Sequence, residues 1–119
     1  MLFKFEEKDG VIICRFLEHK ISNAEHSLLR DAFETLINKG VTSFALDLSK
    51  VNYMGSPGIG SLITINDLSN KTAAELSKES RFVLFGLNVN VKNLLNMLKV
   101  DTFIKIAQSE EEAINWIKT

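Results

Sequence analysis

The sequence predicts a single α/β domain with a small mixed, mainly parallel β-sheet, flanked by about four helices and opening with a β-hairpin. Apolar runs of strand length alternate with segments whose apolar residues recur every three or four positions, which is typical of parallel sheets with helical crossovers. An Asp-Gly pair separates the first two runs and favours a hairpin there. The 119 residues are 45% apolar and 24% charged, with neither a repeat nor a linker-like stretch, so we treat 1–119 as one domain.

The expected hairpin rests on its turn residues. Strand-like runs at 2–5 and 11–16 flank Lys8-Asp9-Gly10. Asp-Gly suits the left-handed backbone conformations that a tight hairpin turn requires. The first two strands are therefore expected to be antiparallel neighbours.

The first helix is predicted from a start signal, a stripe and a stop signal. Ser22, followed three residues later by Glu25, matches a capping box. Gly40 supplies a left-handed stop. The inward-facing stripe between them is expected to comprise Leu28, Leu29, Ala32, Phe33, Leu36 and Ile37.

Two buried strands and a second helix come next. The segment 44–48 is apolar at both alternating positions, as expected for a central strand covered on both faces. The second helix is expected to begin near Pro57 and to continue or break somewhere within 70–80. Its inward residues are expected to be Ile59, Leu62, Ile63 and Leu68. A further buried strand is predicted at 82–85.

The rest of the chain repeats the alternation. Asn88 is expected to cap a third helix. Its apolar stripe is Val91, Leu94, Leu95 and Leu98, and its polar face carries Asn90, Asn93 and Asn96. A short last strand is expected from Phe103, Ile104 and Ile106. The capping-box pattern Ser109–Glu112 predicts a final helix that buries Ala113, Ile114, Trp116 and Ile117. Parallel neighbours in this order need right-handed helical crossovers.

Composition and charge argue against several classes of protein. Fourteen basic and fifteen acidic residues leave a net charge of −1, which gives no long-range attraction toward nucleic acid or an anionic membrane. No apolar run approaches the roughly 20 residues of a membrane span. Cys14 is the one cysteine, so no internal disulfide is expected, and without a secretion signal a reducing cytoplasm is the expected location.

One segment is not explained by the needs of a core. Residues 46–60 carry glycines around a Ser-Pro pair. Ser56 occupies an expected helix N-cap and Pro57 the first helical position, so the Ser56 hydroxyl is expected to accept a hydrogen bond from the amide of Gly58 or Ile59. The glycines leave the backbone open to close approach or allow a positive φ. These residues alone leave three interpretations: an ordinary cap, an anion or nucleotide site, and a docking surface.

The stretch from Leu46 to Leu62 resembles the signature of the STAS domain (sulfate transporter and anti-sigma factor antagonist). In that signature a strand ending in Asp-Leu-Ser leads to an aromatic residue, Met, Asp, Ser, a small hydroxyl residue, Gly, an aliphatic residue and Gly. The chain matches it at Asp47-Leu48-Ser49, Tyr53-Met54, Ser56 and Gly58-Ile59-Gly60, with Gly55 at the acidic position and Pro57 at the second hydroxyl position. The resemblance implies the STAS fold for the whole chain.

The chain is more similar to free-standing bacterial anti-sigma factor antagonists than to transporter domains. In those antagonists a partner that is both anti-sigma factor and serine kinase phosphorylates the serine at the position of Ser56. The resemblance implies a switch in which the unphosphorylated chain binds the anti-sigma factor and frees a sigma factor, the phosphorylated chain releases it, and a phosphatase resets the cycle. It implies partner contacts at Met54, Gly55, Ser56, Pro57, Gly58, Ile59 and Gly60, with Asp47 in support.

The other polar residues suggest no chemistry. His19 and His26 lack a matching Cys or acidic cluster, so neither a metal nor another cofactor is expected. No nucleophile, base and oxyanion hole come together, so we expect no catalytic residues and a non-enzymatic protein. A monomer or weak homodimer is expected. Asp47 is expected to satisfy loop amides and Cys14 to lie in the core. Two alternatives stay open: a constitutive scaffold or assembly subunit, and a small-ligand or nucleotide-binding domain.

Overall fold

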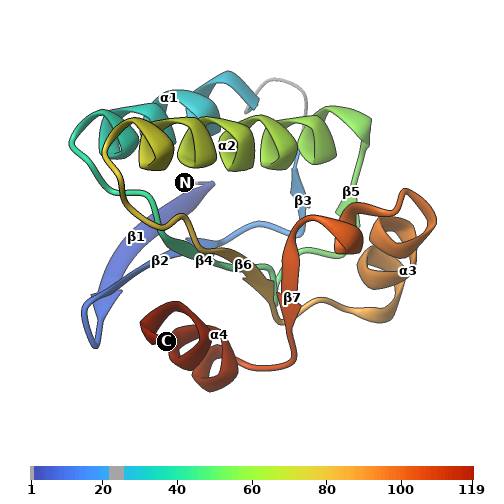
Figure 1. The fold of residues 1–119 in the computed structure, drawn as a ribbon. Helices are drawn as coiled ribbons and strands as arrows, with labels where there is room; N and C mark the ends of the chain where they lie inside the picture. The colour runs from blue at the N-terminus through green and yellow to red at the C-terminus, as the bar shows by residue number, and fades with distance from the viewer. Residues whose placement is uncertain (1, 22–25) are drawn as a thin grey trace.

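The computed structural model describes residues 2–21 and 26–119 and contains a five-stranded sheet in the order β1-β2-β4-β6-β7 (Figure 1). Its strands are β1 (Phe3–Lys8), β2 (Val11–Phe16), β4 (Phe44–Asp47), β6 (Phe82–Phe85) and β7 (Lys105–Ala107). Within this sheet β1 and β2 are antiparallel and the other neighbours are parallel. The predicted mixed, mainly parallel sheet is confirmed, with β4 at its centre.

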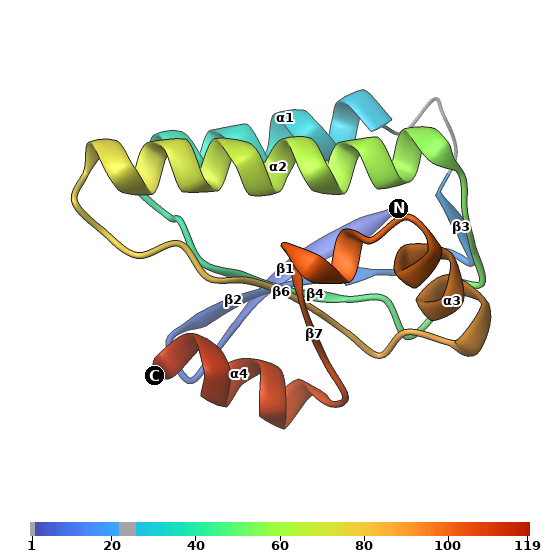
Figure 2. The same ribbon diagram turned by 45° about the vertical axis from the view of Figure 1, so that its right-hand side comes forward.

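Helices cover both faces of the sheet. They are α1 (His26–Asn38), α2 (Ser56–Glu75), α3 (Val89–Met97) and α4 (Glu110–Lys118). The helices α1 and α2 lie side by side over one face, whereas α4 lies against the opposite face (Figures 1 and 2). None of the helices formed by the described residues is both long and apolar enough to cross a membrane.

The predicted hairpin is confirmed in detail. Asp9 and Gly10 have φ of 54° and 81°, so both turn residues are left-handed, and Lys8 pairs with Val11 directly before and after them. This is the turn geometry that matches the twist of two antiparallel strands. The hairpin places Arg15 of β2 beside β4, where it takes part in an ion cluster described below.

The helix α1 ends at the predicted glycine, but its line of fully buried residues is narrower than the predicted stripe. Gly40 has φ of 94°, its amide donates to the Ile37 carbonyl, and the Val41 amide donates to the Leu36 carbonyl. This is a Schellman termination. Leu28 is 63% exposed, so its expected inward position is wrong. The buried line is Leu29, Phe33 and Ile37, and Leu28 lies about 100° around the helix from Leu29. The capping box at 22–25 lies outside the described residues.

The sheet separates two cores. On the α1, α2 and α3 face the core includes Phe16, Phe33, Phe44, Leu62, Ile65 and Leu95. On the α4 face a smaller core includes Val11, Ile13, Ala45, Val83, Ala113 and Ile114. Cys14 belongs to the first core, as expected, and burial raises the pKa of its thiol. An inert core thiol has no redox role to play.

The second and third helices show where simple spacing fails. The helix α2 continues to Glu75, and its buried residues are Gly58, Ile59, Ser61, Leu62, Ile65, Asn66, Ser69 and Ala73. Ile63 and Leu68, expected inside, are only partly buried. Leu98 is 52% exposed because α3 ends at Met97 and the chain turns away there.

The predicted caps of α3 and α4 are present. The Asn88 side chain accepts a hydrogen bond from the Val91 amide at 2.8 Å. The Ser109 hydroxyl accepts one from the Glu112 amide at 3.1 Å. The Glu112 carboxylate accepts from the amide of Gln108 at 3.3 Å rather than from that of Ser109, so the second half of the capping box is displaced by one residue.

The last strand is displaced from its expected position. A 3₁₀ helix, η2 (Val100–Thr102), follows α3, and β7 begins only at Lys105. Phe103 is 51% exposed and lies outside the strand. Ile104 is buried directly before the strand, so its apolar side chain led to the prediction that it is a strand residue.

Candidate docking site at the start of helix α2

A second, two-stranded sheet leads the chain into α2. It pairs β3 (Lys20–Ile21) with β5 (Tyr53–Met54) in parallel. The amides of Asn52 and Tyr53 donate to the His19 carbonyl oxygen at 2.7 and 3.2 Å. Met54 is 1% exposed and anchors β5 in the first core. The site's entry is therefore held by backbone bonds and one buried side chain.

The helix α2 begins one residue earlier than expected. Gly55 is the N-cap, with φ of −83° and ψ of 175°, and no side chain caps the helix. Ser56 is the first helical residue, so its predicted role as N-cap is wrong. The reason is that extended Gly55 already places its carbonyl 3.1 Å from the Ile59 amide, which closes the first helical turn.

The Ser56 hydroxyl is left facing solvent. Ser56 and Pro57 are both exposed. The expected hydrogen bond to the Ser56 side chain from Gly58 or Ile59 is not formed, because the Ile59 amide is bonded to Gly55. Pro57 has no amide hydrogen. The amides of Ser56 and Gly58 therefore remain as the first-turn donors without an acceptor in the helix.

The glycines do not serve a positive φ. The left-handed glycines are Gly10, Gly40 and Gly86, so none belongs to the site. A methyl group on Gly60 would meet no atom within 4 Å, and one on Gly55 would make only ordinary contacts with Tyr53 and Pro57. The fold thus requires glycine at neither position, and their effect is to leave the start of α2 bare of side chains.

The expected partner-binding residues divide by burial. Gly55 and Gly60 are half-buried, while Met54, Gly58 and Ile59 are buried. The buried ones shape the surface from beneath. Tyr53, which was not predicted to be a surface residue, is 58% exposed, and the Lys20 ammonium lies 5.9 Å from its ring centroid. An aromatic residue directly before the predicted start of a helix was the feature of the sequence that could have indicated this exposed position.

Asp47 supports the loop before the site. One of its carboxylate oxygens accepts from the Ser49 amide at 2.9 Å, which confirms its expected role. The other accepts from Arg15 Nη1, also at 2.9 Å. Arg15 additionally donates to Glu6 at 2.7 Å and to Glu110 at 2.6 Å. This ion cluster, which sequence reasoning missed, ties β1, β2, β4 and α4 together.

The ion cluster shifts the pKa values of Glu110, Glu6 and Arg15. Hydrogen bonds from Arg15 and then Lys8 lower the pKa of Glu110 to about 2. The Arg15 bond also lowers the pKa of Glu6, and the bonds from Glu110 and Glu6 raise the pKa of Arg15. Each group therefore stays charged at neutral pH. Structural ion pairs explain these shifts without catalysis.

The helix start is not accompanied by a metal site in the part of the chain that the structure describes. Within residues 2–21 and 26–119, no three His, Cys, Asp or Glu side chains gather to hold a metal ion. His19 is exposed, with Nδ1 3.1 Å from the Lys50 carbonyl oxygen. A cavity of about 430 Å³ is lined by Leu87, Lys92, Asn96, Asp101, Lys105, Ile106, Ala107 and Gln108. It lies between α3 and β7, and residues 54–60 do not line it.

The fold and the site define a small α/β domain with an exposed helix start that carries an unshielded serine. The family model described as STAS domain matches residues 3–113. The chain therefore belongs to the STAS domain family, and the resemblance drawn from residues 46–62 is confirmed.

Solved structures show the same fold at low sequence identity. An anti-sigma factor antagonist from Mycobacterium paratuberculosis is 19% identical, with a TM-score of 0.79 over 98% of this chain and 93% of that one. An anti-sigma-factor antagonist (STAS) domain protein from Planctomyces limnophilus is 16% identical, with a TM-score of 0.79 over 97% and 96%. The phosphorylated form of the Bacillus cell fate determinant SpoIIAA is 20% identical, with a TM-score of 0.71 over 97% and 98%.

Proposed function

We propose that this chain is a non-enzymatic, cytoplasmic binding module that acts as an anti-sigma factor antagonist. In this proposal the start of α2 docks on a kinase-type anti-sigma factor, which frees a sigma factor, and phosphorylation of Ser56 ends the interaction. A phosphatase restores the binding form. The observation that carries the proposal is the exposed Ser56 hydroxyl in the first turn of α2, unbonded to any cap and flanked by small residues.

The geometry favours Ser56 as the modified residue. A kinase needs a hydroxyl that it can reach, and Ser56 is exposed between half-buried Gly55 and exposed Pro57. The buried serines of the same helix, Ser61 and Ser69, are 0% exposed and are out of reach without unfolding. Among the serines of α2, Ser56 is therefore the one that the folded domain presents.

Electrostatics explain how one phosphate would change binding but not folding. A phosphate adds about −1.5 to −2 charge and three acceptor oxygens. At the first turn of α2 it meets the positive end of the helix dipole and the amides of Ser56 and Gly58. In an interface the same charge must lose its water, which is costly unless arginines receive it. The phosphorylated domain stays folded while the complex weakens.

The test is phosphorylation by the cognate kinase-type anti-sigma factor. The folded protein is incubated with that kinase and ATP, and the phosphate is located by mass spectrometry. We expect one phosphate on Ser56, none on Ser56→Ala, and loss of binding in Ser56→Asp. Ser49→Ala, in the exposed loop before β5, is the matched control and should be modified like wild type. Phosphate on another residue, with binding indifferent to Ser56→Asp, would overturn the proposal.

A second function, a constitutive scaffold or assembly subunit, is favoured by Gly55 and Pro57. Gly55 brings no carboxylate next to Ser56, and Pro57 removes one amide that would otherwise face a phosphate. This alternative predicts that wild type and Ser56→Ala bind the partner equally, whether or not the kinase and ATP are present. The same binding measurements therefore separate the two functions.

A further inference from the structure

The outer edge of β1 carries backbone groups that have no hydrogen-bond partner among residues 2–21 and 26–119. β1 is the first strand in the sheet order and is hydrogen-bonded on one side only, to β2. The Leu17 amide donates to the Leu2 carbonyl oxygen at 2.8 Å, and the hairpin turn closes on the Lys8–Val11 pair. In an antiparallel ladder every second residue faces its partner strand. Lys4 and Glu6 therefore bond toward β2, and the backbones of Phe3, Phe5 and Glu7 face outward.

No other backbone hydrogen bond within the described part of the chain reaches these outward groups. The backbone hydrogen bonds outside regular elements include none from Phe3, Phe5 or Glu7. The strand runs six residues without a proline, and its ladder with β2 is paired residue for residue without a bulge. A long, regular and open edge is a template for another strand. The outer edge of β1 is therefore open to pairing with another strand.

The side chains of β1 are complementary to a second, antiparallel copy of the same strand. We propose that the chain forms a two-fold dimer in which β1 pairs antiparallel with β1 of another copy, centred on Phe5. In this register Phe5 pairs with its own equivalent and Phe3 pairs with Glu7, and each such pair exchanges both backbone bonds. The two five-stranded sheets become one continuous sheet.

The charges of Lys4, Glu6 and Lys8 favour the register centred on Phe5 over the two neighbouring registers. With Phe5 at the centre, Lys4 lies opposite Glu6 of the other copy, so opposite charges meet on the α4 side of the sheet. Centring the pair on Glu6 would place Glu6 opposite itself and Lys4 opposite Lys8. Centring it on Lys4 would place Lys4 opposite itself. Like charges directly opposite are destabilising, and both shifts also lose backbone bonds.

The side chains needed for pairing are in place. The Lys4 ammonium lies 3.0 Å from Glu6 Oε1 in one chain, and both side chains are partly exposed, at 49% and 38%. Arg15 holds the other Glu6 oxygen at 2.7 Å, which fixes the carboxylate near the edge. On the opposite face the Phe5 ring packs edge-on against Phe33 of α1, 5.3 Å between centroids. A short edge-to-edge contact buries little surface, so the dimer is weak and forms at high concentration.

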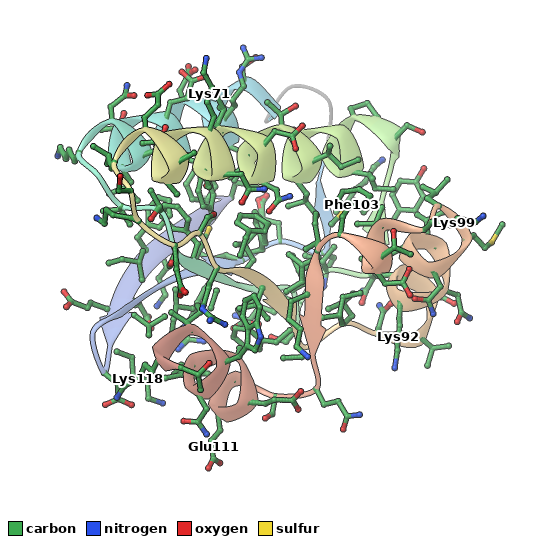
Figure 3. All side chains as sticks on the ribbon, in the orientation of Figure 1. Lys71, Lys92, Lys99, Phe103, Glu111 and Lys118 are labelled. Carbon is green, nitrogen blue, oxygen red and sulfur yellow. The ribbon has the colours of Figure 1, made fainter. Side chains whose placement is uncertain are left out.

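The experiment compares wild type with two charge reversals of equal size. Lys4→Glu places a carboxylate opposite Glu6 of the other copy, on both sides of the two-fold axis. Lys71→Glu makes the same change on the outer surface of α2, far from β1 (Figure 3). Sedimentation velocity and amide hydrogen exchange are recorded from about 20 µM to about 1 mM, with thermal melts to confirm that each variant folds.

The expected result is weak dimerisation of wild type and of Lys71→Glu. In Lys4→Glu the dissociation constant rises at least roughly tenfold. Exchange should slow with concentration at Phe3, Phe5 and Glu7, whose amides face outward, and not at Lys4 or Glu6, whose amides already bond to β2. A wild type that is monomeric at about 1 mM overturns the proposal. So does a dimer insensitive to Lys4→Glu, or one whose protected amides lie outside β1.

Discussion

Asn88 joins α3 to the loop that leads into the docking site: its Nδ2 donates to the Val51 carbonyl oxygen at 3.1 Å while its Oδ1 accepts from the Val91 amide at 2.8 Å. One side chain thus caps a helix and holds the backbone two residues before Tyr53. The donor and the acceptor of the same amide group serve different elements, so substitutions can separate the two roles.

We expect Asn88→Ala to lose both roles and Asn88→Asp to lose one. Loss of an N-cap costs about 1 kcal/mol, and the lost bond to Val51 adds about 1 kcal/mol. Aspartate retains the capping acceptor but cannot donate to Val51. Urea denaturation should therefore rank wild type above Asn88→Asp and Asn88→Ala lowest. Equal stability of the two variants would show that the bond to Val51 contributes nothing.

Gly86 has little space around it. Its φ is 74°, and an added methyl carbon would lie 3.1 Å from Ser49 Cβ and 3.2 Å from the Ser49 nitrogen. Gly10, with φ of 81° and open space, is the matched control. Gly10→Ala should lose about 1 kcal/mol from backbone strain alone, and Gly86→Ala at least about 1 kcal/mol more from the clash. Equal losses on thermal unfolding would contradict the close approach.

Gly60 should behave in the opposite way. A glycine inside a helix costs about 1 kcal/mol relative to alanine, and a methyl group at position 60 meets nothing within 4 Å. Gly60→Ala is therefore expected to raise the free energy of unfolding by about 0.5–1 kcal/mol. If α2 is the docking surface, Gly60→Gln should bind the partner more weakly while remaining folded. A variant that binds like wild type would place the interface elsewhere.

Acid should weaken the fold through Glu110. Arg15 and Lys8 hold the folded-state pKa of Glu110 at about 2, below its ordinary value of 4.5. A lowered folded-state pKa means that this stabilisation is complete above about pH 4.5 and is lost as the pH falls toward about 2. Glu110→Gln should cost about 1–2 kcal/mol at pH 7, with the gap to wild type closing in acid.

The neighbouring Glu111 provides the control for that measurement. It lies in the same helical turn of α4 and is exposed, with its side chain pointing outward (Figure 3). Glu111→Gln makes the same chemical change without touching Arg15 or Lys8. Denaturation curves between pH 2 and pH 7 should show a pH-dependent gap for Glu110→Gln alone. A gap of constant size would assign the loss to packing rather than to charge.

A negative charge at position 56 should stabilise the free domain. Ser56 is the first residue of α2, where a carboxylate meets the positive end of the helix dipole. Ser56→Asp is expected to raise the free energy of unfolding by about 0.3–1 kcal/mol at low salt and by less at about 1 M salt. Destabilisation of the free domain would mean that phosphate acts by disturbing the fold rather than the interface.

The fold was predictable where local chemistry decides it. Asp9-Gly10 admits few conformations other than a tight turn, and the run at 82–85 is apolar enough to require burial. The strands β3 and β5 were missed because two residues have no periodicity and their pairing joins positions 33 residues apart, as in Lys20 with Tyr53. The position of β7 was missed because buried Ile104 precedes the strand instead of belonging to it.

The site was predictable in composition but not in geometry. The Ser-Pro pair and its glycines located the start of α2. Whether Gly55 or Ser56 is the cap depends on which of the two residues has the extended backbone conformation, and in the structure it is Gly55. The role of Gly60 depends on what surrounds it. The Arg15 cluster joins Glu6, Asp47 and Glu110, the last 95 residues away along the chain. Contacts between residues so far apart in the sequence depend on the order of the strands in the sheet, which is known only from the folded structure.

The division of the apolar interior by the sheet has a consequence for how this domain can diverge. The side that bears Ser56 rests on α1, α2 and α3, whereas α4 and its smaller apolar cluster sit behind the strands. Because the two apolar cores share no residue, substitutions at the start of α2 are expected to alter recognition while the packing of α4 stays intact.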